Sequence, residues 1–258
     1  MNKLFSAGSF LKYRLNADNA HDIHSPFVYD LFNNLLYDKT PYYCFDLVES
    51  VRAKQLLNNN KINIKDFGTG KNHRTVLVSD IAKKAVKPKK YAQLLFRLVN
   101  RFSSENILEI GTSLGISTLY LSMPNTKSKI ITLEGSPEIA AIAKNNFEFI
   151  QRKNIELICG EFEESLPKAL LKFNKLDLVY FDGNHKRNPT LSYFEKCLDL
   201  STEDSIFVFD DIYWSRDMKN AWKEIKKNSN VTLSIDLFQF GIVFFKKGLE
   251  KQHFTLRY

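Results

Sequence analysis

A glycine-rich turn between an apolar strand and a helix is the feature that most constrains how this chain can fold. The apolar run 107–110 leads into Gly111-Thr112-Ser113-Leu114-Gly115, and we expect a helix to begin near Ser117. Such a turn points the backbone amides of a helix N-terminus at a ligand. Ribose-binding sites also need an acidic residue at the tip of the next strand, about 20 residues further along the chain. Glu134, which ends the apolar run 129–133, stands at that separation from Gly111.

A second glycine pair, in Asp66-Phe67-Gly68-Thr69-Gly70, also follows a short apolar run. No apolar strand ending in an acid comes after it, because Asp80 stands in a lysine-rich segment. The loop at Gly111 is therefore the better candidate for a nucleotide-type site. Whether Asp66–Gly70 is an ordinary turn or a segment that reaches the site stays open.

Short apolar strands alternate with amphipathic helices from about residue 100 onward. We expect strands at 107–110, 129–133, 155–159, 176–181, 205–209, 231–237 and 240–245. We expect helices at 117–123, 137–150, 166–173, 190–200 and 218–227. This alternation predicts an α/β fold with a mostly parallel sheet and helices on both faces. The last two strands are joined by too few residues for a crossover helix, so they should pair antiparallel.

Residues 1–90 do not follow that rhythm. Ser25 to Tyr37 is typical of a capped amphipathic helix, and 46–58 of a second helix. We expect 1–90 to form a mainly helical cap on a domain spanning 91–258, with the basic segment 83–90 as the join.

The composition narrows the classes of partner. The formal charge of +8 comes largely from lysine clusters, which either attract nucleic acid or form a solvated surface. We prefer the solvated surface, because aromatic residues do not interleave with the lysines. Three distant cysteines indicate a reducing compartment without disulfides or zinc. No apolar run reaches the roughly 18 residues of a membrane helix, and the short N-terminal apolar stretch is too broken for a signal peptide. We therefore expect a cytoplasmic protein without a membrane partner.

The segment 107–118 resembles the first motif of class I S-adenosylmethionine-dependent methyltransferases. Its G-x-x-x-G-x-S form resembles that of the catechol and caffeoyl-CoA O-methyltransferase group. The segments 24–27, 182–185 and 210–215 resemble those of bacterial predicted methyltransferases whose substrate is not named. The resemblance runs from about Tyr91 to the C-terminus. It implies a Rossmann-like methyltransferase domain with a seven-stranded, mostly parallel sheet whose last strand is antiparallel.

The resemblance also implies a set of cofactor contacts. Glu109, the loop and Ser117 would hold the methionine part of S-adenosylmethionine, and Glu134 would accept both ribose hydroxyls. The segment Gly160-Glu161-Phe162 would flank the adenine. The implied cofactor-binding residues are Glu109, Gly111, Thr112, Ser113, Gly115, Ser117, Glu134, Gly160, Glu161, Phe162 and Asp182.

Acidic residues at two further strand tips stand where metal-using members of the group carry magnesium ligands. Asp182 matches the first ligand, while Asp210 and Asp211 stand at an Asp-Asn pair, so Asp211 departs from the pattern. His185 stands at the group's catalytic lysine and is a candidate general base beside Asp182. Carboxylates suit Mg²⁺. The alternatives stay open: one carboxylate caps a helix or turn, and His185 is a structural residue.

We therefore expect O-methylation of a small-molecule acceptor, helped by His185 or by Mg²⁺. An RNA methyltransferase is the first alternative, although the tip at 182–185 lacks the Asn-Pro-Pro-Tyr-like form of amino-methylating enzymes. A non-catalytic cofactor-binding protein is the second. The acceptor, the use of a metal and the formation of a homodimer stay open.

Overall fold

The computed structural model describes residues 3–64, 74–248 and 250–258. The glycine pair within Asp66–Gly70 lies outside the described residues. The chain divides into two compact units. The middle unit is Lys39–Phe173, and the N/C unit combines Met1–Asp38 with Asn174–Tyr258. These units do not coincide with a boundary at residue 90, and the division into a cap of 1–90 and a domain of 91–258 stays a prediction.

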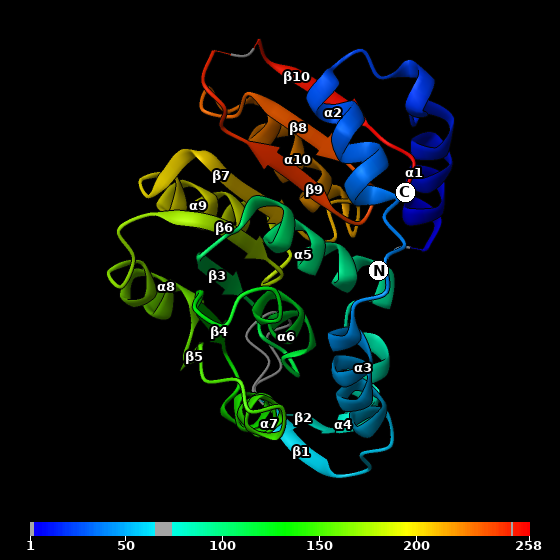
Figure 1. Ribbon diagram of the computed structural model, residues 1–258. Coiled ribbons are helices and arrows are strands. Elements are labelled where there is room, and N and C mark those ends of the chain that lie inside the picture. Colours follow the sequence, from blue (N-terminus) through cyan, green and yellow to red (C-terminus); the bar gives the residue numbers. More distant parts are fainter. Residues whose placement is uncertain (1–2, 65–73, 249) are drawn as a thin grey trace. The chain divides into compact units, whose positions relative to one another are not determined.

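The middle unit contains three parallel strands flanked by helices. In chain order its elements are α3 (Tyr43–Leu56), β1 (Lys61–Ile64), β2 (Arg74–Leu77), α4 (Val78–Lys84), α5 (Lys89–Phe102), β3 (Asn106–Ile110), α6 (Ile116–Ser122), β4 (Lys129–Glu134), α7 (Pro137–Phe149), β5 (Ile155–Cys159) and α8 (Phe162–Leu170). Strand β4 pairs in parallel with both β3 and β5. Helices α6 and α8 lie on different sides of these strands (Figure 1). Strands β1 and β2 form a separate antiparallel pair.

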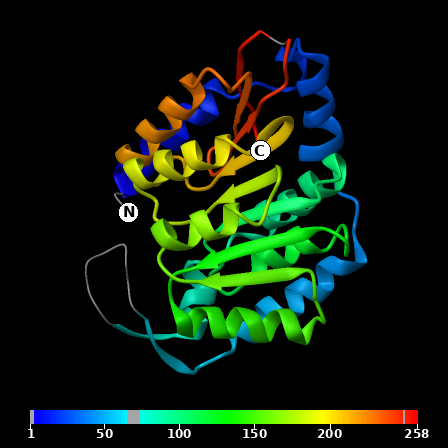
Figure 2. The same ribbon diagram turned by 90° about the vertical axis from the view of Figure 1, so that its left-hand side faces the viewer.

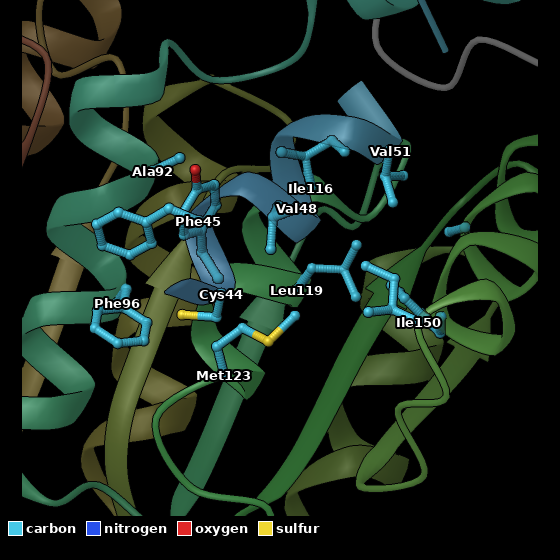
Figure 3. Close-up of a cluster of buried hydrophobic side chains, with 13 residues drawn as sticks. Cys44, Phe45, Val48, Val51, Ala92, Phe96, Ile116, Leu119, Met123 and Ile150 are labelled. Carbon is cyan, nitrogen blue, oxygen red and sulfur yellow. The ribbon is translucent and has the colours of Figure 1, made fainter. Parts of the chain in front are cut away.

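A buried apolar cluster joins α3, α5 and α6 in the middle unit. Side chains from the three helices converge in Figure 3, where the labelled residues are Cys44, Phe45, Val48, Val51, Ala92, Phe96, Ile116, Leu119, Met123 and Ile150. The rings of Phe45 and Phe96 meet edge to face with centroids 4.9 Å apart. Burial of these side chains fixes the position of α6, the helix that follows the glycine loop. The apolar side chains stay out of water only while the helices remain packed together.

The N/C unit contains the remaining strands. Its elements are α1 (Lys3–Asn16), η1 (Ala20–Asp22), α2 (Pro26–Leu31), η2 (Phe32–Leu36), β6 (Leu176–Phe181), α9 (Arg187–Leu198), β7 (Ser201–Phe209), α10 (Arg216–Lys227), β8 (Leu233–Asp236), β9 (Gly241–Phe244) and β10 (Gln252–Thr255). Strands β6 and β7 are parallel, β9 runs antiparallel to both β7 and β8, and β10 pairs in parallel with β8. Figure 2 gives a second view of the same strands.

The alternation expected from the sequence is confirmed from β3 to β9, and so is the antiparallel pairing of β8 with β9. The strand count is wrong by one. The described strands from β3 to β10 number eight because β10, which follows the expected last strand, adds an edge beside β8. Its sequence Gln252-His253-Phe254-Thr255 is too short and polar to be recognised as a strand.

Several elements differ from what the sequence predicted. Helix α1 forms over the broken apolar stretch at the N-terminus, and β1 and β2 add a hairpin-like pair to a region expected to be mainly helical. The basic segment 83–90 ends α4 and begins α5, so it joins two helices. Helix α5 is buried on all sides between Leu94 and Val99.

Candidate active site

The glycine turn after β3 is shaped by backbone that few residue types adopt. Gly111 has φ 108° and Gly115 has φ 78°. A Cβ added at Gly115 would lie 2.4 Å from a ring carbon of Phe147, so both conformation and space demand glycine here. The amides of Gly111 and Thr112 both donate to the carbonyl of Leu133 on β4, each at 3.0 Å. The turn is thereby anchored to the neighbouring strand.

Glu109 lies beneath this turn and is fully buried. Its Oε2 accepts hydrogen bonds from the hydroxyls of Thr118 and Thr132, the latter at 2.6 Å. Burial raises the pKa of Glu109 to about 7, and hydrogen bonds from Ser117, Thr118 and Thr132 oppose that rise. Its Oε1 is buried and meets no donor in hydrogen-bonding geometry among the described residues. A buried acceptor of this kind is ready for a donor supplied by a ligand.

Glu134 stands at the tip of β4 beside the loop. Its Oε2 accepts from the amide of Ser113 at 2.8 Å, and its Oε1 accepts from the amide of Ser136 at 3.0 Å. Burial raises the pKa of Glu134, while these amides lower it. A carboxylate has about four acceptor positions, so two remain for further donors such as ribose hydroxyls.

Gly160 follows β5, the next strand along the sheet. Its φ is 150°, its amide donates to the carbonyl of Glu134 at 2.9 Å, and an added Cβ would meet no atom within 4 Å. Glu161 is exposed and precedes α8, and Phe162 is half-buried at its first position. This open edge next to Glu134 is compatible with a flat group such as adenine.

These features fit S-adenosylmethionine. Glu109 offers a buried acceptor, Glu134 keeps acceptor capacity at a strand tip, and Gly160 leaves space beside it. Thr112 is fully buried and places its hydroxyl 2.6 Å from that of Thr132, so its side chain supports the loop from within. Ser117 is also buried, close to Glu109. The sequence did not single out Thr118 and Thr132, although their hydroxyls orient Glu109.

The N/C unit brings a second polar group together. One possible ligand atom from each of Asp182, His185 and Asp210 lies within 4.8 Å of the others, and these three residues are called the acidic cluster below. Among the residues that the structure describes, Asp211 does not belong to it. His185 Nε2 lies 3.6 Å from Asp182 Oδ1, and the Tyr180 hydroxyl donates to Asp182 Oδ2 at 3.1 Å. The sequence did not single out Tyr180, since a tyrosine within an apolar strand carries no polar signal.

The backbone around the acidic cluster is strained. Asn184, His185 and Asp211 have φ of 66°, 22° and 51°, values that residues with a Cβ seldom adopt. The His185 ring lies 6.4 Å from that of Trp214, which is 42% exposed. Strain of this kind collects at functional sites, where packing elsewhere maintains it. Asp182 and Asp210 offer oxygens to a hard cation, while the imidazole of His185 suits softer divalent ions better than Mg²⁺.

Comparison with known proteins shows what the chain is similar to. Residues 108–212 match a family described as a methyltransferase domain. A catechol O-methyltransferase of Niastella koreensis is 29% identical over 48% of this chain and 55% of its own length. One from Mycobacterium tuberculosis is 27% identical over 46% of this chain and 54% of its own length. The chain thus spans about half the length of these curated relatives.

The crystal structure of an O-methyltransferase from Bacillus cereus in complex with SAH superposes with a TM-score of 0.57. It is 21% identical and covers 82% of this chain and 94% of its own. The matched part of the chain is thus similar to class I S-adenosylmethionine-dependent methyltransferases of the catechol and caffeoyl-CoA type. The Rossmann-like fold of these methyltransferases is therefore confirmed. No helix within the described residues of this chain combines the length and apolarity needed to cross a membrane.

Proposed function

We propose that the chain transfers a methyl group from S-adenosylmethionine to an oxygen of a small molecule. The observation that carries this proposal is the pair of acids set around one glycine turn, Glu109 beneath it and Glu134 beside it. Few structural reasons place a carboxylate at the end of an apolar strand, and here the loop amide of Ser113 holds that carboxylate in position.

Residues at different strand tips would bind different parts of the cofactor. Glu109 with the backbone of Gly111 to Gly115, Thr112, Ser113 and Ser117 would hold the methionine part. Glu134 would accept the ribose hydroxyls, and the segment 160–162 would flank the adenine. Bound S-adenosylmethionine supplies an electrophilic methyl group. Asp182 stays a predicted contact to S-adenosylmethionine.

His185 is proposed as the general base. It would take the proton of the acceptor hydroxyl, whose oxygen then bonds to the methyl carbon as the carbon–sulfur bond breaks and S-adenosylhomocysteine leaves. Asp182, whose Oδ1 lies 3.6 Å from Nε2, would orient the ring. Holding the acceptor in line with the methyl carbon lowers the entropic part of the barrier.

A divalent cation is the second form of the proposal. Asp182 and Asp210 would hold it, and a bound cation would stabilise the deprotonated acceptor. Asp211 stays a predicted ligand outside the acidic cluster. The helical cap predicted at 1–90 would choose the acceptor.

The first test is calorimetric binding of S-adenosylhomocysteine to wild type and Glu134→Ala. We expect tight binding by wild type and a loss of about 100-fold or more in the variant, since two hydrogen bonds to a charged group are together worth about 3 kcal/mol or more. Glu148→Ala is the matched control, because Glu148 is an exposed acid on α7 outside the site. No binding by wild type, or equal losses in both variants, would remove the proposed cofactor site.

A second experiment separates the base from the metal. Methyl transfer to a catechol is measured with added Mg²⁺, with Mn²⁺ and with EDTA. Activity that survives EDTA and disappears in His185→Gln supports the base, and activity that EDTA abolishes and either ion restores supports the cation. Binding of S-adenosylhomocysteine without transfer to any hydroxylated acceptor would instead support a non-catalytic protein.

A further inference from the structure

A pocket lies in the N/C unit between one face of α1 and one face of α10. It has a volume of about 190 Å³. Helix α1 contributes Ser9, Lys12, Tyr13 and Asn16, helix α10 contributes Lys219, Trp222, Lys223 and Lys226, and Tyr213 and Thr255 complete the lining. The helical residues recur every three or four positions, so each helix turns one face to the pocket. We call this the lysine pocket.

Four lysines line this pocket, and acids do not balance them. None of the four forms an ion pair with a carboxylate of the described residues. The nearby Asp236 is buried and already accepts from the Tyr213 hydroxyl at 2.7 Å and the Trp222 ring N–H at 3.3 Å. Burial lowers the pKa of Lys219, the charges of Lys12 and Lys223 lower it further, and the single charge of Asp236 opposes them. The cations therefore repel one another in the absence of an anion.

Aromatic rings hold two of these lysines in place. The ammonium of Lys219 lies 5.5 Å from the ring centre of Tyr213 and 5.7 Å from that of Phe5. Lys226 lies 5.6 Å from the ring centre of Trp222 and 2.6 Å from His253 Nε2. Lys12 and Lys223 are exposed. Two cations beside aromatic rings and two exposed ones, with hydroxyl and amide groups beside them, form a surface that can surround a compact anion.

We propose that the lysine pocket binds the phosphate or pyrophosphate group of a small molecule. The concentration of positive charge favours a multiply charged anion over a single carboxylate, because each lysine then finds an oxygen. The cavity is smaller than the roughly 300 Å³ at which pockets for whole drug-sized ligands begin. It therefore accommodates the anionic group alone, with the rest of the ligand outside. This site does not depend on the methyl transfer proposed above.

The test is calorimetric titration of the full chain with sodium pyrophosphate, and separately with ADP, at constant ionic strength. The variant is Lys12→Gln with Lys223→Gln, since both side chains are exposed and neither supports the packing. We expect both ligands to bind wild type, with affinity falling about tenfold or more in the variant as two charge-assisted contacts are lost. Tighter binding of ADP than of pyrophosphate would identify a nucleotide as the source of the anion, and equal binding would identify the free anion.

The matched control is Lys227→Gln with Lys247→Gln, which removes the same charge from two exposed lysines outside the pocket. Its affinity should stay within about twofold of wild type, because distant exposed charges are screened by salt. Absence of pyrophosphate binding, or an equal loss in the control, would overturn the proposal. A short single-stranded RNA that binds more tightly than ADP and displaces pyrophosphate would overturn it in favour of nucleic acid.

Discussion

The glycine turn and the acidic cluster are both built at strand tips, yet their acids are held in different ways. Around the turn, Glu109 accepts from two threonine hydroxyls and Glu134 from two backbone amides. In the acidic cluster, Asp182 accepts from Tyr180 while His185 lies 3.6 Å away on strained backbone. The first arrangement fits the proposed binding of the cofactor, and the second fits the proposed role of His185 as a base. Substitutions in the two regions should therefore affect binding and turnover separately.

The largest effect is expected from His185→Gln. Loss of a general base lowers turnover by about 10³-fold. Binding of S-adenosylhomocysteine should hardly change, because His185 lies in the acidic cluster and not in the glycine turn. His24→Gln, which alters an exposed histidine, is the control and should keep full activity. The comparison fails if His185→Gln weakens binding of S-adenosylhomocysteine as strongly as it lowers turnover.

Gly115→Ala should damage the binding region through its fold. The new Cβ would lie 2.4 Å from the Phe147 ring at a backbone φ of 78°. Overpacking of up to about 3 kcal/mol and left-handed strain of about 1 kcal/mol predict a loss near 4 kcal/mol in the free energy of unfolding. Urea denaturation measures it. A variant with wild-type stability would show that Phe147 moves aside easily and that the turn is less rigid than the structure indicates.

Glu109→Gln tests the buried acid by its pH dependence. The pKa of Glu109 is about 7 in the folded protein against an ordinary 4.5. The folded state therefore binds a proton more tightly than the unfolded state, and stability falls as pH rises from 4.5 to 7. That fall amounts to about 3 kcal/mol at most. The variant lacks the titrating group, so its stability relative to wild type should rise over this range and stay level above pH 7.

Urea denaturation of both proteins at pH 4.5, 6 and 8 makes the measurement. Glu148→Gln, at an exposed acid on α7, is the control and should follow the wild-type curve. Parallel curves for wild type and Glu109→Gln would mean that the pKa of Glu109 is the same in the folded and unfolded states. Burial would then not raise it.

The two regions also differ in how far the sequence predicts them. The loop at Gly111 and the acid at Glu134 follow from local spacing, because a strand, a turn and the next strand tip are close in the chain. Thr118 and Thr132 were not predicted, since a threonine hydroxyl has no signature until its partner is placed. The acidic cluster could be predicted as strand tips with His185 beside Asp182, but not that Asp211 would lie outside it.

Elements without a periodic pattern could not be predicted from the sequence either. Strand β10 is short and polar, and it forms because β8 offers it a partner. The lysine pocket joins Lys12 to Lys223, residues far apart in the chain. The sequence argued against aromatic residues among the lysines, yet Tyr213 and Trp222 lie beside Lys219 and Lys226 in three dimensions. Such proximity depends on tertiary packing, which linear patterns do not report.

The smallest effect on stability, and the sharpest test of the binding region, is expected from Gly160→Ala. Gly160 has a positive φ like Gly115, but an added Cβ there would meet no atom within 4 Å. Strain alone then lowers the free energy of unfolding by about 1 kcal/mol.

If the adenine lies against this backbone, the same methyl group occupies the cofactor's space, and affinity for S-adenosylhomocysteine should fall by more than strain explains. Calorimetry on Gly160→Ala, with Gly8→Ala in α1 as the control, compares the two effects. Unchanged affinity would place the adenine elsewhere and leave Glu109 and Glu134 as the supported part of the cofactor site.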